Sequence, residues 1–130
     1  IGICELDLSC SKIINSESFY TKPTQSIISN YCVELTGITA ELIKKQGRPF
    51  PEAINSLVKR FSPLRKTWFG WGAYDRIMLE DHFKKYNITN PMCKNYINLK
   101  NLYGIKYGLK RELGLKSYYH KSAPLTGILK

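Results

Sequence analysis

The sequence predicts a single α/β domain, and three observations predict it. Residues 1–20 carry two runs in which apolar and polar residues alternate, which is typical of strands. Residues 29–61 carry helical spacing interrupted by capping residues and glycine. Residues 66–86 pass from an aromatic-rich run through a glycine-containing turn into a further helical pattern, so strands and helices both contribute to the fold.

The chain opens with an expected pair of antiparallel strands. Residues 1–8 alternate apolar with polar or small side chains, and a second strand is expected over residues 12–20. The segment from Ser9 to Lys12 suits a hairpin turn. Pro23 ends the second strand, because proline has no N–H group to donate to a ladder.

Three helices are expected next. Ser29 or Asn30 can cap the first, and Thr39 can cap the second, which ends at Gly47. The third spans residues 51–61. Its apolar side chains fall on one face and predict a contribution to the core: Ala53, Leu57, Val58 and Phe61.

The order strand, turn, acidic residue and helix is expected around Asp75. Residues 66–74 suit a buried strand that runs into a turn, and residues 75–86 resume helical spacing. Asp75 therefore lies at or near a helix N-terminus, where a negative charge is favoured. This order is found at the active-site edge of α/β folds.

A short strand at residues 96–99 and a helix at residues 99–107 are expected to follow. Residues 108–114 continue with helix-like spacing, whereas residues 117–130 predict only a weak final helix. At 130 residues, with 43% apolar residues, the chain fits one domain with one modest core.

Charge and cysteine usage narrow the class of protein. Twenty Lys and Arg against ten Asp and Glu give a formal net charge of +10, which favours nucleic acid as a partner; a basic surface that only maintains solubility is the alternative. Four scattered cysteines without metal-ligand spacing indicate free thiols and a cytoplasmic location. The uncharged stretches are too short for a membrane span, so no membrane partner is expected.

Three stretches, taken in order, resemble a known family. The first is YCVELTGIT at residues 31–39, followed by FPEA at residues 50–53. The second is WGAYD at residues 71–75, and the third is YINLK at residues 96–100, which leads to GLK and LGL further on. In this combination they resemble the DEDDh-type 3′-5′ exonucleases, in the branch that acts on RNA 3′ ends and histone messages and includes KapD-like bacterial proteins.

The resemblance implies a fold and a chemistry. The fold is ribonuclease H-like, a mixed sheet flanked by helices. The activity is hydrolysis of the terminal phosphodiester bond of RNA or single-stranded DNA. Four carboxylates hold two Mg²⁺ or Mn²⁺ ions about 4 Å apart, and a histidine acts as general base.

Two residues match the family's catalytic set. Asp75 corresponds to the third acid, a metal ligand, and its ordinary alternative is a helix N-cap. His120 falls where the general base is expected, a role suited to a side chain that titrates near neutral pH. The alternative for His120 is an exposed histidine.

Other members of the catalytic set are missing. The resemblance places the family's opening strand, with its Asp-x-Glu pair, upstream of Ile1, so the domain is expected to be incomplete at its N-terminus and at its C-terminus. Glu5 and Asp7 have the same spacing in reversed order, but two solvent-facing acids on an edge strand is the preferred interpretation. Pro124 stands where the family has its last metal-binding Asp, and proline cannot ligate a metal.

Nucleic-acid contacts are expected from two kinds of residue. The segment that contains Leu35, Thr36 and Ile38 packs against terminal bases in related enzymes, and a buried helix face is its alternative. Trp71, Tyr118 and Tyr119 can stack on unpaired bases. A core position is the alternative for Trp71, whereas Tyr118 and Tyr119 have Lys121 as a neighbouring cation.

Two functions therefore stay open from the sequence. One is a metal-dependent 3′-5′ exonuclease domain. The other is a catalytically inactive relative that binds nucleic acid or a protein partner, which is indicated by Pro124 and by the net charge of +10.

Overall fold

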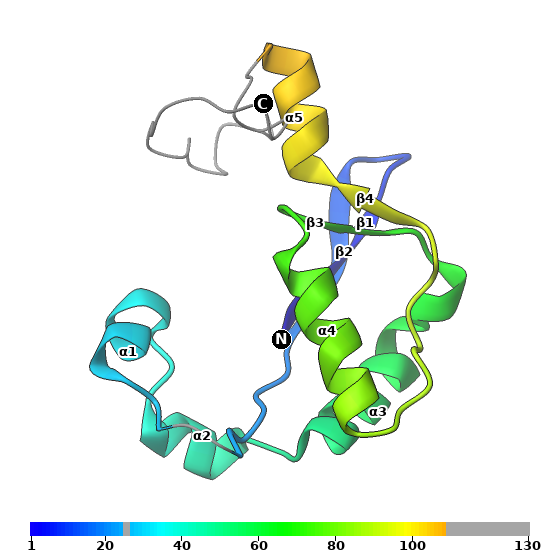
Figure 1. Ribbon diagram of the computed structural model, residues 1–130. Helices are drawn as coiled ribbons and strands as arrows, with labels where there is room; N and C mark the ends of the chain where they lie inside the picture. Colours follow the sequence, from blue (N-terminus) through cyan, green and yellow to red (C-terminus); the bar gives the residue numbers. More distant parts are fainter. Residues whose placement is uncertain (25–26, 109–130) are drawn as a thin grey trace.

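The computed structural model describes residues 1–24 and 27–108, and it has the α/β composition that the sequence predicts (Figure 1). The chain opens with β1 (Gly2–Asp7) and β2 (Lys12–Ser18), which pair antiparallel as the expected hairpin. A register shift between Glu5 and Leu6 inserts one extra residue into β2. Alternate residues of β1 are half-buried, but this face carries Glu5 and Asp7 beside Ile3, while Leu6 is exposed, so the expected burial of the apolar residues is wrong for the second half of the strand.

Two short helices follow, each held by the cap that its sequence predicts. In α1 (Asn30–Thr36) the Ser29 hydroxyl accepts the N–H of Cys32 at 3.2 Å, so Ser29 rather than Asn30 is the cap. In α2 (Ala40–Gln46) the Thr39 hydroxyl accepts the N–H of Leu42 at 3.1 Å. Neither helix has a buried residue.

The third helix supplies most of the core. α3 (Phe50–Phe61) begins one residue earlier than expected, and the 3-10 turn η1 (Pro63–Arg65) follows it. Phe19 after β2, Phe83 and Met92 complete the cluster, and Val58, expected in the core, packs partly buried against it. The buried side chains of α3 are Phe50, Ala53, Ile54, Leu57 and Phe61.

The second half of the described chain repeats a strand and helix order. β3 (Trp68–Gly70) leads into α4 (Tyr74–Lys85), and β4 (Tyr96–Asn98) leads directly into α5 (Leu99–Tyr107). β3 and β4 pair parallel. The strand expected over residues 66–74 is shorter than predicted, because Gly72 adopts a φ of 93° and turns the chain out of the ladder.

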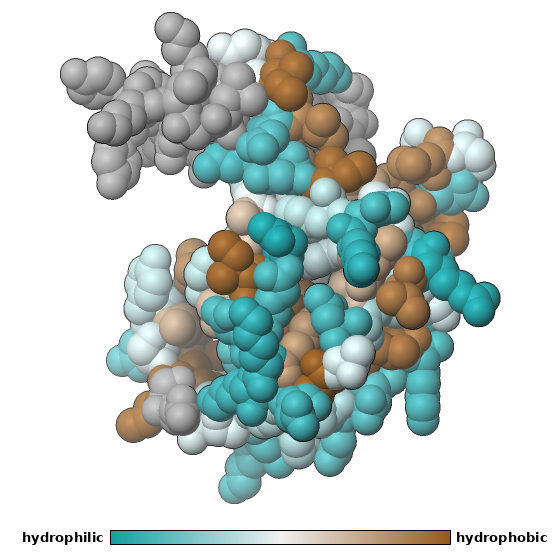
Figure 2. Space-filling model, turned by 45° about the vertical axis from the view of Figure 1, so that its right-hand side comes forward, coloured by the Kyte–Doolittle hydropathy of each residue, from teal (hydrophilic) through white to brown (hydrophobic). Residues whose placement is uncertain are grey.

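The described residues thus form two separate two-stranded sheets, β1–β2 and β3–β4. Figure 2 shows hydrophilic and hydrophobic groups interspersed over one face of the molecule. None of the helices within these residues is long and apolar enough to cross a membrane. All four cysteines are free thiols, as expected. The helical segments expected over residues 108–114 and 117–130 lie almost entirely outside the described residues.

Leu57 is the side chain whose truncation we expect to cost most stability. It is 1% exposed at the centre of the α3 face, so Leu57→Ala leaves a cavity and lowers the free energy of unfolding by about 2–5 kcal/mol. Urea denaturation measures this change. Leu64→Ala is the matched control, because Leu64 is 65% exposed and its truncation changes stability by less than about 0.5 kcal/mol. Equal losses in the two variants would contradict the assignment of the core.

Candidate functional site

Strands β3 and β4 end side by side, at an edge that we call the carboxyl edge. β3 ends at Gly70 and β4 at Asn98, and because the strands are parallel both carboxyl ends lie on the same side. The loop of residues 71–73 leads from this edge into α4, and α5 begins there directly after Asn98. Ligands of parallel α/β sheets bind at such an edge.

Two side chains of β4 hold the loop in place. The N–H of Gly72 donates to Asn98 Oδ1 at 2.9 Å, and the same oxygen accepts the N–H of Lys100 at 3.0 Å, which caps α5. The Tyr96 hydroxyl donates to the carbonyl oxygen of Gly72. A Cβ atom on Gly70 would lie 2.6 Å from the Tyr96 hydroxyl oxygen, so this close approach requires glycine.

Asp75 is the acidic group of the carboxyl edge. It is exposed in the first turn of α4, where the partial positive charge of the helix N-terminus favours a carboxylate. Its position confirms the order strand, turn, acid and helix. The structure places it after a loop of fixed shape, within reach of solvent.

The electric field of Asp75 reaches β4. Burial, and to a smaller degree the negative charge of Asp75, raise the pKa of the Tyr96 hydroxyl, while the positive charge of Arg76 opposes this rise. The Arg76 guanidinium lies 5.5 Å from the centroid of the Tyr96 ring. Asp75, Arg76 and Tyr96 therefore form one electrostatic neighbourhood.

The residues expected to contact terminal bases lie in a separate element. Leu35 is 70% exposed on α1, and the Thr36 hydroxyl donates to the carbonyl oxygen of Cys32 at 2.6 Å and accepts the N–H of Ile38 at 3.2 Å. Ile38 is partly buried. Among residues 1–24 and 27–108, no hydrogen bond or salt bridge joins α1 to α4, so Leu35 and Asp75 are not directly connected.

Of five further predicted site residues, one lies at the carboxyl edge and four lie outside the described residues. Trp71 is partly buried in the loop at the carboxyl edge, where its ring contacts Tyr103 with centroids 5.5 Å apart. The others fall in residues 109–130, outside the described residues. They are His120, Tyr118, Tyr119 and Lys121.

Glu5 and Asp7 have structural roles in the hairpin. Glu5 forms a salt bridge with Lys66. Asp7 accepts the N–H and the hydroxyl of Ser9 at 2.8 and 2.6 Å, and these hydrogen bonds lower the pKa of its carboxyl group. These contacts give both residues structural roles in the hairpin, and both are half-buried rather than solvent-facing as expected.

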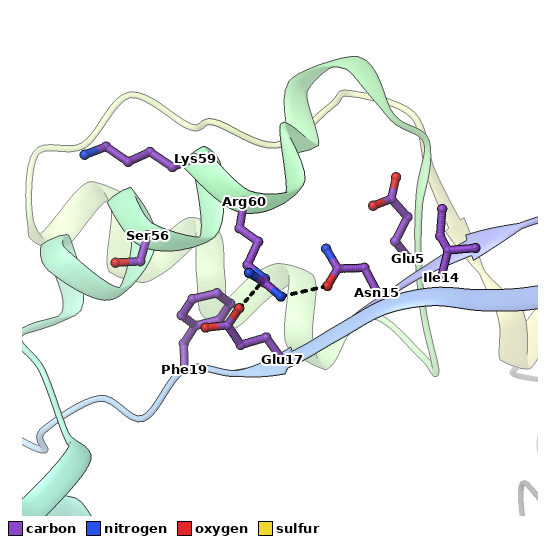
Figure 3. Close-up of a pocket in the computed structure, with 8 residues that line it drawn as sticks. All are labelled: Glu5, Ile14, Asn15, Glu17, Phe19, Ser56, Lys59 and Arg60. Carbon is purple, nitrogen blue, oxygen red and sulfur yellow. Dashed lines mark hydrogen bonds and ion pairs between the residues drawn. The ribbon is translucent and has the colours of Figure 1, made fainter.

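A hollow of about 790 Å³ lies between α3 and the hairpin (Figure 3). Arg60 reaches across it to Glu17 at 2.5 Å and to Asn15 at 3.2 Å. The charge of Glu17 is thereby compensated, as Lys66 compensates that of Glu5. Both carboxylates of the hollow are thus paired with cations, and its lining is Glu5, Ile14, Asn15, Glu17, Phe19, Ser56, Lys59 and Arg60.

The described residues do not fit a two-metal centre by themselves. Within residues 1–24 and 27–108, no three His, Cys, Asp or Glu side chains gather in a way that could hold a metal ion. A pair of Mg²⁺ or Mn²⁺ ions bridged by protein carboxylates needs several such ligands, and Asp75 supplies one.

Comparisons with protein-family models, with curated proteins and with solved structures found no match to this chain.

The sequence did not predict a role at this edge for four residues whose contacts the structure shows: Tyr96, Asn98, Tyr103 and Tyr107. Asn98 could have been found as a helix cap, because it directly precedes the helical pattern. The two tyrosines of α5 are spaced by four residues, which places them on one face of a helix. The contacts of Tyr96 with Gly70 and Gly72 join residues more than twenty positions apart, and no local signal encodes them.

We expect Asn98→Ala to loosen the carboxyl edge. The substitution removes the acceptor shared by Gly72 and Lys100, so the free energy of unfolding falls by about 1–2 kcal/mol. Urea denaturation measures the loss. Asn101→Ala is the control, since Asn101 is an exposed asparagine of the same helix. A loss of equal size in Asn101→Ala would show that Asn98 has no special role.

The titration of Tyr96 tests the reach of the Asp75 charge. Asp75→Asn removes a negative charge that disfavours phenolate, so the pKa of Tyr96 falls toward its ordinary value of 10.0. The raised pKa stabilises the fold fully below about pH 10, and this contribution is lost as the pH rises through the raised pKa. Phenolate absorbance measures the pKa, with Tyr96→Phe as the reference that subtracts the other tyrosines, and urea denaturation at several pH values measures the stability. An unchanged pKa in Asp75→Asn would contradict the coupling.

Proposed function

We propose that this chain is an exonuclease-like domain of the DEDDh type, with a ribonuclease H-like fold, which binds the 3′ end of RNA or single-stranded DNA at the carboxyl edge. The observation that carries the proposal is the position of Asp75. It is an exposed carboxylate at the start of α4, directly after a loop that Tyr96 and Asn98 hold in shape. A metal-ligating carboxylate needs such a fixed and open position.

The charge distribution supports a polyanionic partner. The whole chain carries a formal net charge of +10. Four salt bridges occur among the described residues, and they involve Arg60, Lys66, Arg76 and Lys84. Basic side chains outside these pairs, such as Lys44 and Lys45 at the end of α2, have their charge available for phosphate groups.

Exposed apolar side chains on α1 support a contact with unpaired bases. Leu35 and Tyr31 are each 70% exposed, and no residue of α1 is buried. In the proposed complex this helix covers the terminal bases, while the backbone phosphates pass the carboxyl edge. Hydrolysis additionally needs carboxylates beyond Asp75 to complete a metal site.

A nuclease assay tests the proposal. The chain is incubated with 5′-labelled single-stranded RNA and DNA with Mg²⁺ or Mn²⁺, and gel electrophoresis follows release of 3′ nucleotides. We expect Asp75→Asn to abolish release. Asp81→Asn, which makes the same charge change at an exposed position of α4, retains it. Equal loss in the two variants, or no binding of either nucleic acid, would overturn the proposal.

A binding domain without hydrolysis is the second candidate. Two observations favour it: the described residues hold no three-ligand group, and Pro124 stands in the sequence where the family pattern has an Asp. This candidate predicts binding of single-stranded RNA that weakens steeply between low and high salt, with no nucleotide release in the parent chain. Fluorescence anisotropy at several salt concentrations measures the binding, and the same nuclease assay separates the two candidates.

A further inference from the structure

Three aromatic rings form a continuous row beside the carboxyl edge. The rings of Trp71 and Tyr103 meet edge to face, with centroids 5.5 Å apart and planes at 61°, and those of Tyr103 and Tyr107 are tilted by 47° with centroids 4.6 Å apart. Trp71 lies in the loop before α4, whereas both tyrosines lie on α5. We call Trp71, Tyr103 and Tyr107 the aromatic row. It begins four residues before Asp75 and ends at a side chain that is 49% exposed.

Two lysines of α5, Lys100 and Lys106, lie close to the row in the helix. Lys100, Tyr103 and Tyr107 follow the spacing i, i+3 and i+7, so they share one face of α5. The Lys106 ammonium nitrogen lies 5.4 Å from the centroid of the Tyr107 ring. Neither lysine forms a salt bridge within the described part of the chain. Within residues 1–24 and 27–108, the row thus combines the exposed ring of Tyr107 with two lysines that form no salt bridge.

The sequence around α5 contains no acid, although Asp75 lies close to the start of the row. From residue 82 to residue 108 there is no Asp or Glu, and the basic residues in this stretch are Lys84, Lys85, Lys94, Lys100 and Lys106. The part of this surface on α5 therefore suits an anionic partner. An acidic peptide would satisfy the lysines, but the exposed ring of Tyr107 beside Lys106 also offers a flat face to a planar group. Single-stranded nucleic acid offers both flat bases and phosphates.

We infer that the aromatic row is a stacking platform for the bases of single-stranded nucleic acid that runs from the carboxyl edge along α5. The inference rests on the proposed function and deepens it: Tyr103 and Tyr107 contact bases, and Lys100 and Lys106 contact phosphates. Every base has a flat π-face, so the platform binds without a strong preference for sequence.

Substitution of Tyr107 tests the platform. The parent chain and its variants are titrated into a fluorescein-labelled oligouridylate, and anisotropy gives the dissociation constant. Tyr107→Ala removes one ring and weakens binding by about 5- to 150-fold. Tyr107→Phe keeps the ring and restores the affinity of the parent chain. Ile105→Ala is the matched control, because Ile105 is 67% exposed on the opposite face of α5, and its truncation leaves the affinity unchanged.

An abasic oligonucleotide of equal length separates stacking from charge. It keeps the phosphates and lacks the bases, so the parent chain and Tyr107→Ala bind it equally. An equal loss on both ligands would overturn the stacking role, and so would an oligouridylate affinity that is the same in Tyr107→Ala and in the parent chain. In either case the parent chain still binds and the proposed function stands. Failure of the parent chain to bind any single-stranded nucleic acid overturns the proposed function itself, and far-UV circular dichroism verifies that each variant is folded.

Discussion

Burial of one face of α3 is the interaction on which the described fold depends. Ala53 and Leu57 are each 1% exposed, and Phe61 at the end of the same face is 3% exposed. The hairpin attaches to this face through Phe19, whose ring centroid lies 6.3 Å from that of Phe61. Helix α4 attaches through Phe83, whose ring centroid lies 5.9 Å from that of Phe50. Removing this apolar surface from water is the main force that assembles the three elements.

The position of the candidate site follows from that packing. Because Phe83 anchors α4 against α3, the first turn of α4 is held at the end of β3, and Asp75 is held with it. The contacts of Tyr96 and Asn98 with Gly72 then set the conformation of the loop before the helix. Core packing thus gives Asp75 its place, and a small set of polar contacts gives the loop its shape.

Binding and catalysis make different demands on such a site. Binding of a nucleic-acid strand needs positive charge and exposed apolar or aromatic side chains, and α1 and α5 carry such side chains, while α5 also carries Lys100 and Lys106. Two-metal hydrolysis needs several carboxylates at nearly fixed separations, and the described residues offer Asp75 alone at this edge. The proposed binding and the proposed hydrolysis therefore depend on different residues of this chain.

Local patterns in the sequence determined the elements of this protein. The hydroxyl caps of α1 and α2 and the apolar face of α3 are each encoded within a few neighbouring residues, and each is present as expected. The acidic start of α4 is encoded in the same way. The resemblance to an exonuclease family also came from the sequence, and it stays a proposal.

Only the tertiary structure decided which distant residues meet. In the structure the strand before Asp75 is only Trp68–Gly70, and β1–β2 and β3–β4 are separate pairs. Tyr96 contacts Gly72, and Tyr103 contacts Trp71. These contacts join residues 24 or more positions apart. The stability of these contacts depends on how whole elements pack against α3, and a short sequence pattern does not encode that packing.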